Sequence, residues 1–151
     1  MYKISDVNDT YADCENEQQF KKLYCITEIK QTYTGNVNVK QKIFCIETEE
    51  TVAGFPDVME LVTVREGSVT FRQAYFYEFK CSDKSGGIKF QPTQPPFYRQ
   101  NEELSVTVIA YNRVSRRVHI FSAMDIFDKE SPYYTSNNRI NLSKVEKELG
   151  I

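Results

Sequence analysis

Side chains at helical spacing predict the first element of the chain. The stripe consists of Phe20, Leu23, Tyr24 and Thr27, a spacing that places all four on one face of a helix. We expect this helix to begin near Asp13, whose carboxylate can cap the first turn, and to end before the turn signal at Gly35.

Runs rich in β-branched and aromatic residues predict five strands farther along the chain. They cover residues 42–48, 58–64, 69–80, 105–111 and 117–121. A tight turn at Glu66-Gly67 joins the second run to the third, so these two are expected to form a hairpin. Because proline is favoured in the first turn of a helix, a second helix is expected from about Pro95 to Glu103.

The order of these elements predicts an α/β fold. A last helix is expected from Ser143 to Leu149, capped by Asn141 or Ser143, which completes the order α-β-β-β-α-β-β-α. Helices that alternate with strands in this way flank a central mixed β-sheet. The 151 residues suffice for a single domain, with a core expected at residues 13–121 and a C-terminal extension at residues 122–151.

The distribution of apolar residues gives no sign of a membrane partner. No apolar run is long enough to cross a bilayer, and the N-terminus turns acidic at Asp6 without the apolar segment of a signal peptide. We therefore expect a cytoplasmic protein.

The cysteines and the histidine argue against two kinds of chemistry. The four cysteines, Cys14, Cys25, Cys45 and Cys81, form no C-x-x-C pair, and the only histidine, His119, is far from them in sequence. A zinc site and a cysteine–histidine or serine–histidine catalytic pair are therefore not expected. The cysteines are expected to be buried reduced thiols, and His119 to pack on a strand face.

Charge is distributed unevenly, although the formal net charge is only −2. Residues 1–64 contain 6 Lys or Arg and 11 Asp or Glu, whereas residues 65–120 contain 9 and 5. The middle of the chain can thus present a basic face to phosphates. Ordinary scatter of surface charge would produce the same pattern.

Two short motifs bring together residues with catalytic chemistry. Gly54-Phe55-Pro56-Asp57 opens one predicted strand of the hairpin, and Glu78-Phe79-Lys80 closes the other. Side chains alternate along a strand, so Glu78 and Lys80 share a face while Phe79 points away. Pairing of the hairpin places Asp57 beside both charged residues.

Two carboxylates and an ammonium group suit phosphodiester hydrolysis. Carboxylates bind Mg²⁺ through oxygen ligands, and a bound ion lowers the pKa of water and polarises a phosphoryl oxygen. A nearby lysine can position that water and stabilise charge on the phosphate. E-x-K alone is common on solvated strands, so the order and strand context of both motifs matter.

The order G-x-P-D, hairpin, E-x-K and a helix introduced by glutamine resembles the PD-(D/E)XK nuclease superfamily. Residues 78–94 resemble its VRR-NUC and Holliday-junction-resolvase-like branch, in which E-x-K is followed by a glycine-containing loop and a glutamine. The layout agrees over roughly residues 13–121, and the specific residues lie within 54–94. The resemblance implies a restriction-endonuclease-like core of order α-β-β-β-α-β.

The resemblance assigns roles to individual residues of this chain. Asp57 and Glu78 would bind a divalent metal, with the backbone carbonyl of Phe79 as a further ligand. Lys80 would contact the attacking water or the scissile phosphate, and Gln94 would face the site from the start of its helix.

The first helix and the basic residues near the site complete the expected set. The family tends to place a glutamate on the first helix, and Glu17 is preferred because it shares a face with Phe20. Glu15 and Glu28 stay open as alternatives. The residues expected to contact nucleic acid are Lys84, Lys89 and Arg99.

The function implied is that of a Mg²⁺- or Mn²⁺-dependent DNA endonuclease in repair or recombination. The small size favours recognition of DNA shape, such as a junction or flap, over readout of a long sequence. Two cuts at a junction would suit a homodimer, and a phage or mobile-element origin would fit so compact a nuclease. RNA is an alternative substrate. The alternative functions are a catalytically silent nuclease fold that binds nucleic acid or protein, and an unrelated α/β interaction module.

Overall fold

A single mixed sheet of six strands organises the chain, of which the computed structural model describes residues 2–46 and 52–151. Its strands are β1 (Tyr2–Asp6), β2 (Val39–Cys45), β3 (Val58–Glu66), β4 (Val69–Cys81), β6 (Thr107–Asn112) and β7 (Arg117–Ser122). Their order across the sheet is β1-β7-β6-β4-β3-β2. Only β4 and β6 are parallel, and the chain between them crosses one face of the sheet through α2.

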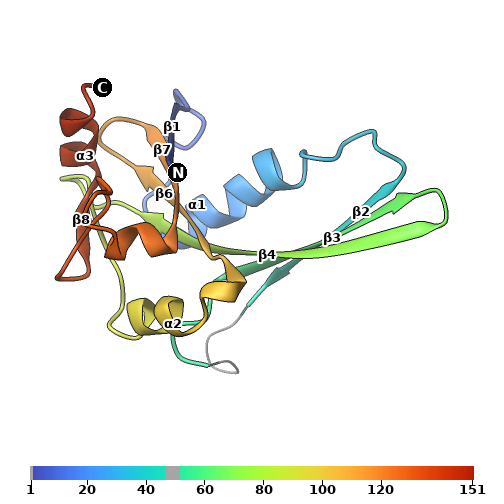
Figure 1. The fold of residues 1–151 in the computed structure, drawn as a ribbon. Helices are drawn as coiled ribbons and strands as arrows, with labels where there is room; N and C mark the ends of the chain where they lie inside the picture. The colour runs from blue at the N-terminus through green and yellow to red at the C-terminus, as the bar shows by residue number, and fades with distance from the viewer. Residues whose placement is uncertain (1, 47–51) are drawn as a thin grey trace.

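Three α-helices and a small second sheet flank this sheet in the described part of the chain (Figure 1). The helices are α1 (Glu17–Tyr24), which continues as a π-helical segment (Cys25–Ile29), α2 (Gln94–Gln100) and α3 (Leu142–Glu148). Two 3₁₀ turns cover Glu102–Leu104 and Ala123–Phe127, and β5 (Gly87–Lys89) pairs with β8 (Arg139–Asn141). The protein is therefore a single-domain α/β fold with a central mixed sheet, as predicted.

The hydrophobic core lies on both faces of the sheet because its central strands are buried on both sides. Along β6, Val108 and Ala110 pack toward α2 and α3, whereas Ile109 and Tyr111 pack toward α1. Phe20 of α1 is fully buried against the second face. Figure 1 shows α1 above the sheet and α2 below it.

The C-terminal segment belongs to the same core. Its buried side chains include Tyr133, Ile140, Leu142 and Val145, which pack in the cluster that also contains residues of β6 and β7. Residues 122–151 thus close one face of the sheet instead of extending from it.

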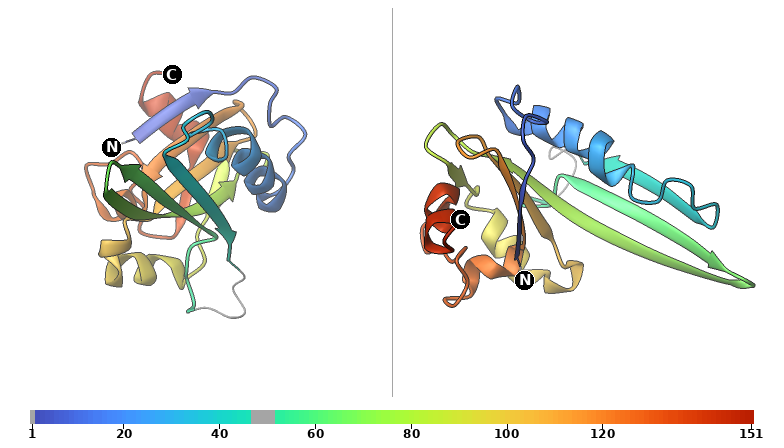
Figure 2. Two further views of the ribbon diagram at one scale, coloured as in Figure 1. Left: turned by 90° about the vertical axis from the view of Figure 1, so that its right-hand side faces the viewer. Right: turned by 90° about the horizontal axis from the view of Figure 1, so that it is seen from above.

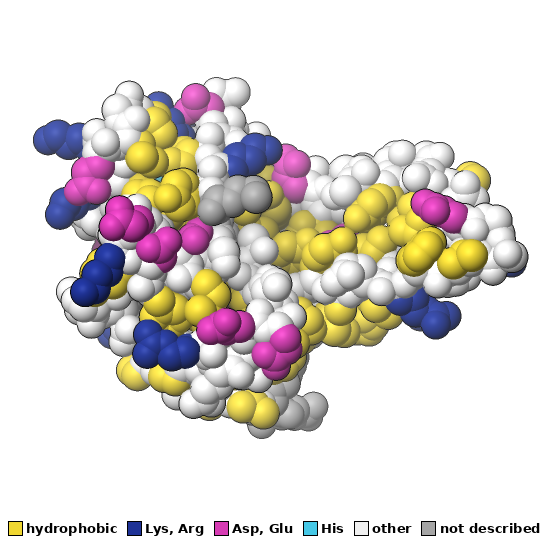
Figure 3. Space-filling view, viewed as in Figure 1, with side chains coloured by type: hydrophobic (Ala, Val, Ile, Leu, Met, Phe, Trp, Pro, Cys, Tyr) yellow, Lys and Arg dark blue, Asp and Glu magenta, His cyan; other side chains and the backbone are white. Residues whose placement is uncertain are grey.

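One part of the sheet projects from the rest of the molecule. We call residues 39–45, 58–66 and 69–77 of β2, β3 and β4 the arm. Figures 1 and 2 show the arm extending well beyond β6 and β7, with the helical segment that starts at α1 lying along one of its faces. Figure 3 shows hydrophobic side chains exposed along the arm. Val69, Phe71 and Tyr75 of β4 are exposed hydrophobic residues of the arm.

The predicted strands and helices were found, with shifts at their ends. The cap at Asp13 was wrong: the Asn16 side chain caps α1 by accepting a hydrogen bond from the Gln19 N–H (2.9 Å). The second helix ends at Gln100, where a 3₁₀ turn follows, and Asn141 caps α3. Residues 47–48 of one predicted strand lie outside the described residues.

Three short strands were not predicted. β1, β5 and β8 have three to five residues each, too few to show an alternating pattern. β1 pairs along the edge of β7 in antiparallel register. β5 and β8 pair with each other in a separate two-stranded sheet, so these strands depend on pairing between segments that are distant in the sequence.

The environments of the cysteines and the histidine differ in part from expectation. All four cysteines are free thiols, but only Cys14 and Cys25 are buried, while Cys81 is half-buried and Cys45 is exposed. His119 lies buried on β7, and both ring nitrogens have polar partners.

No helix among the described residues is both long and apolar enough to cross a membrane.

Candidate metal and active site

The site begins where β4 extends past the end of its neighbour β3. The last β3–β4 pair joins Val58 to Tyr77, and β4 continues to Cys81 paired with β6 alone. This leaves one edge of β4 without a strand over four residues. Asp57, the residue before β3, fills part of that edge: its Oδ2 accepts a hydrogen bond from the Phe79 N–H at 3.0 Å.

Glu17 reaches the same edge from the first turn of α1. The ligand oxygens of Glu17, Asp57 and Glu78 all lie within 4.8 Å of one another. Among the candidates Glu15, Glu17 and Glu28, Glu17 is thus the one whose carboxylate lies beside Asp57 and Glu78. Glu15 borders the same region, and Glu28 is exposed on the π-helical segment.

Glu78 is a buried carboxylate, and one of its two oxygens lacks a hydrogen-bond partner among the described residues. The residue is 1% exposed, and its Oε1 is the oxygen without a hydrogen-bond donor in that part of the chain. Burial and the neighbouring Asp57 carboxylate raise the pKa of Glu78 well above its ordinary value. A buried carboxylate oxygen without a donor, in a side chain that lies close to two other carboxylates, is costly, and a proton or a cation lowers that cost.

Glu17 is perturbed in the same direction. Burial is the main cause that raises its pKa to about 7, and the Asp57 charge adds to it, whereas Lys80 opposes the shift. Carboxyl groups that repel one another near neutral pH fit a divalent cation, which offers the charge that these groups lack. The donor set therefore fits a metal that prefers oxygen ligands.

Lys80 is held in place by three neighbours. Its Nζ lies 3.9 Å from Glu78 Oε2 and donates a hydrogen bond to Gln94 Oε1 at 3.0 Å. The same Gln94 oxygen accepts from the Gln91 N–H at 2.8 Å, and Nζ lies 5.0 Å from the centre of the Phe90 ring. The side chain is 8% exposed, so the ammonium group is ordered and only slightly open to solvent.

Gly54 explains why the first motif begins with glycine. Its φ is +88°, and a Cβ there would lie 2.3 Å from the Thr93 carbonyl oxygen and 2.8 Å from Phe97 Cβ. Only glycine allows this approach and this backbone angle. The segment that carries Asp57 is thereby packed against the start of α2, which carries Gln94.

Two adjoining clefts open at the acidic group. The larger, of about 1110 Å³, is bordered by six cationic side chains, Lys80, Lys89, Arg113, Lys129, Arg139 and Lys144, and by four acidic ones, Glu15, Glu17, Asp83 and Glu148. The second, of about 910 Å³, lies between α1 and β2 and is bordered by Lys21, Lys22 and Lys30. Glu17 borders both clefts, so the carboxylates stand between two basic surfaces.

The residues expected to contact nucleic acid do not gather at one place. Lys89 borders the larger cleft. Lys84 borders a separate, smaller hollow beside Arg113, and the Arg99 guanidinium lies 4.3 Å from the centre of the Phe127 ring. The other cations that border the larger cleft include Lys129, Arg139 and Lys144. No motif in their local sequences predicted this position.

Tyr98 is a further residue at the site that the sequence reasoning missed. It is 1% exposed, and its hydroxyl has no hydrogen-bond partner among the described residues. Burial, followed by the charges of Glu78, Asp57 and Glu17, raises its pKa. Tyr98 lies four residues after Gln94 on α2, so helical spacing from Gln94 was the signal that could have found it.

No family model, curated protein or solved structure matches the chain. The geometry of the described residues therefore carries the functional argument.

Proposed function

We propose that this protein is a divalent-metal-dependent nuclease of the PD-(D/E)XK type that hydrolyses phosphodiester bonds in DNA. The observation that carries the proposal is the orphaned Oε1 of Glu78, buried beside the carboxylates of Asp57 and Glu17. Such an oxygen is costly unless a ligand uses it.

The order of elements supports the same proposal. When the short strands β1 and β5 are set aside, the elements from α1 to β6 run α-β-β-β-α-β, which is the order of the restriction-endonuclease-like core. In this assignment the antiparallel hairpin brings the two motifs together, and α2 leads into the parallel partner of β4.

Each site residue has a distinct part in the proposed reaction. Asp57, Glu78 and Glu17 would hold the metal, with the Phe79 carbonyl as an additional ligand. When bound there, a divalent ion would supply a lowered pKa for a water ligand and polarisation of a phosphoryl oxygen. Lys80 donates a hydrogen bond to the attacking water or the scissile phosphate, and Gln94 keeps the ammonium group oriented.

The clefts supply the remaining requirement, which is attraction of a polyanion. Cationic side chains flank the carboxylates on both sides, and they can neutralise backbone phosphates on either side of the scissile bond. Contacts with the backbone position a substrate without reading its sequence. A flap or junction is therefore the kind of substrate that we propose.

The test separates metal binding from catalysis with two variants. Purified protein is incubated with labelled linear, flapped and four-way-junction DNA in Mg²⁺, Mn²⁺ or EDTA, and Mn²⁺ binding is measured by electron paramagnetic resonance. Glu78→Gln should lose both Mn²⁺ binding and cutting. Lys80→Gln should keep Mn²⁺ binding and lose at least about a hundredfold in cutting rate.

Glu60→Gln is the matched control, because Glu60 is another buried glutamate of the same sheet outside the acidic group. Glu60 is 3% exposed and accepts hydrogen bonds from Gln41 and Tyr77. This variant should cut DNA as the wild type does. Absence of cutting by folded wild-type protein on DNA and on RNA, with Mn²⁺ still bound, would favour a silent nuclease fold. Absence of both would defeat the proposal.

A further inference from the structure

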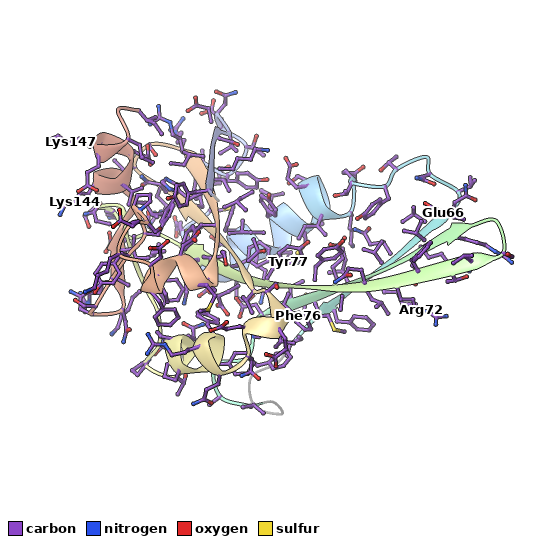
Figure 4. The ribbon with its side chains drawn as sticks, in the orientation of Figure 1. Glu66, Arg72, Phe76, Tyr77, Lys144 and Lys147 are labelled. Carbon is purple, nitrogen blue, oxygen red and sulfur yellow. The ribbon has the colours of Figure 1, made fainter. Side chains whose placement is uncertain are left out.

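The two faces of the arm differ in charge. The strand register places Lys40, Lys42, Arg65 and Arg72 on the face that is turned away from α1. Both carboxylates of the arm, Glu60 and Glu66, point to the opposite face. Figure 4 shows this division directly, with Arg72 and Phe76 on one side of β4 and Glu66 and Tyr77 on the other.

We call the side with the four cations the basic face of the arm. All four cations are exposed, and no carboxylate of β2, β3 or β4 shares their face within the arm. A strip of apolar side chains, Phe44, Met59, Leu61 and Phe76, lies among them, and Phe44 is 42% exposed. Between Phe76 and the tip of the arm, no described helix or strand covers this face (Figure 1).

The positions of the cations suit an extended polyanion. Lys40, Thr63 and Arg72 are aligned across the three strands, so the two cations start about 10 Å apart on opposite edges of the face. Lys42 stands two residues from Lys40, about 7 Å farther along its strand. The face thus presents positive charge over its length and its width.

A second copy of the chain fits this face poorly. A symmetric dimer formed through it would bring four cations against the same four cations, and like charges across an interface are strongly disfavoured. A duplex carries about one negative charge per 1.7 Å of its axis and releases counterions when cations approach it. Charge complementarity therefore selects nucleic acid.

The basic face leads to the candidate active site. Phe76 is two residues before Glu78 on the same side of β4, and the Phe76 ring lies 5.9 Å from the Phe55 ring, two residues before Asp57. Arg72 precedes Glu78 by six residues, which is about 20 Å of strand and equals the length of about six base pairs. A duplex that lies along the arm extends away from the site by that distance.

We propose that the basic face of the arm binds the sugar-phosphate backbone of duplex DNA that flanks the cleavage position. This proposal deepens the proposed nuclease function and rests on it for the identity of the substrate. The arm contributes affinity and orientation, and it takes no part in the chemical step.

The test compares two double variants in an assay that needs no cutting. Lys42→Gln/Arg72→Gln removes two cations from the basic face, and Lys3→Gln/Lys147→Gln removes two exposed cations elsewhere, on β1 and α3. Both are made in the Glu78→Gln background, and binding to a labelled duplex of about 20 base pairs is followed by fluorescence anisotropy over a range of salt concentrations.

The arm variant should bind at least about tenfold more weakly near 0.1 M salt, and its slope of log affinity against log salt should be smaller by about two. The control variant should match the background protein. Equal binding and equal slopes for the two double variants would overturn the proposal. So would an arm variant that changes the sedimentation of the free protein and leaves DNA affinity intact, since that outcome marks a self-association surface.

Failure of this proposal can be told apart from failure of the proposed nuclease function. If wild-type protein cuts DNA while the arm variant binds it as the control does, only the role of the arm fails. If wild-type protein cuts nothing while the arm variant loses affinity, the arm binds DNA and the proposed catalysis fails.

Discussion

Two buried carboxylates in this protein have opposite surroundings. Glu146 of α3 is 3% exposed, and it accepts hydrogen bonds from four side chains, Asn112, Ser115, Arg117 and His119, at 2.6 to 2.9 Å. Glu78 is 1% exposed, and one of its oxygens has no hydrogen-bond donor among the residues that the structure describes.

The pKa values follow this difference. Hydrogen bonds from Arg117, His119 and Asn112 outweigh burial and lower the pKa of Glu146, whereas burial and Asp57 raise the pKa of Glu78. Glu146 is thus satisfied within the fold and ties α3 to β6 and β7. Glu78 is left unsatisfied by the fold and is available to a ligand, which is the property expected of a functional group.

The largest effect on stability is expected at the satisfied carboxylate. Glu146→Ala leaves the Arg117 and His119 partners without their acceptor and should lower the free energy of unfolding by about 3–5 kcal/mol. Denaturant unfolding in EDTA measures this loss. Glu78→Gln should leave that free energy unchanged or raise it by about 1 kcal/mol, because it removes a buried carboxylate whose Oε1 has no hydrogen-bond donor among the described residues. Similar losses in both variants would show that the two carboxylates are equally structural.

A somewhat smaller effect is expected from Gly54, which positions one partner of the Glu78 group. Gly54→Ala combines a positive φ with a close approach to the Thr93 oxygen, and it should cost about 3 kcal/mol. The rate of DNA cutting should fall by more than the loss of folded protein accounts for, because Asp57 shifts relative to Gln94. Gly67→Ala is the matched control: its φ is +61° with open space around it, so strain alone should cost about 1 kcal/mol. Equal losses at both glycines would contradict the packing argument.

The two groups should also respond to pH in opposite directions. In EDTA the folded protein binds more protons than the unfolded chain between the ordinary glutamate pKa and about 7, the value for Glu17. The free energy of unfolding should therefore fall as pH rises through this window, by about 1–2 kcal/mol for Glu17 after allowance for its partial exposure. Mn²⁺ should restore this stability above pH 7. A Glu17→Gln variant with an unchanged pH profile would argue against the shifted pKa.

The Glu146 group should lose stability in acid. Burial is the main cause that lowers the pKa of His119 below its ordinary 6.5. As the pH falls below 6.5, the unfolded chain therefore binds the extra proton and the free energy of unfolding falls. The lowered pKa of Glu146 acts in the same direction at lower pH. Replacement of His119 by Gln should remove the first part of this acid-side decline, which thermal unfolding at a series of pH values would detect. A decline that persists unchanged in that variant would assign it to other groups.

Part of the candidate site could be predicted from the sequence because its geometry is local. The alternation of a strand places Glu78 and Lys80 on one face, and a hairpin necessarily returns its end to its beginning, where Asp57 stands. Glu17 was preferred over Glu15 and Glu28 because helical spacing puts it on the face of Phe20. The structure brings these residues together as that reasoning expected.

Other parts of the site depend on contacts between distant segments. Lys129, Arg139 and Lys144 border the cleft only because β8 pairs with β5 and so brings the C-terminal segment beside β4. Arg99 was expected to face the substrate, yet it stacks on Phe127, a residue of the same distant segment. No periodicity or motif in the sequence reports such a pairing.

By itself the sequence determined the α/β class, the hairpin, the principal helices and the two motifs, because strand alternation, helical spacing and turn residues act over a few positions. Only the tertiary structure decided that β4 outruns β3 and leaves an open edge, that Glu78 is unsatisfied while Glu146 is fully paired, and that the cations of the arm share one face. Those properties depend on strand register and on which segments exclude water from a side chain, and both are settled when the whole chain packs.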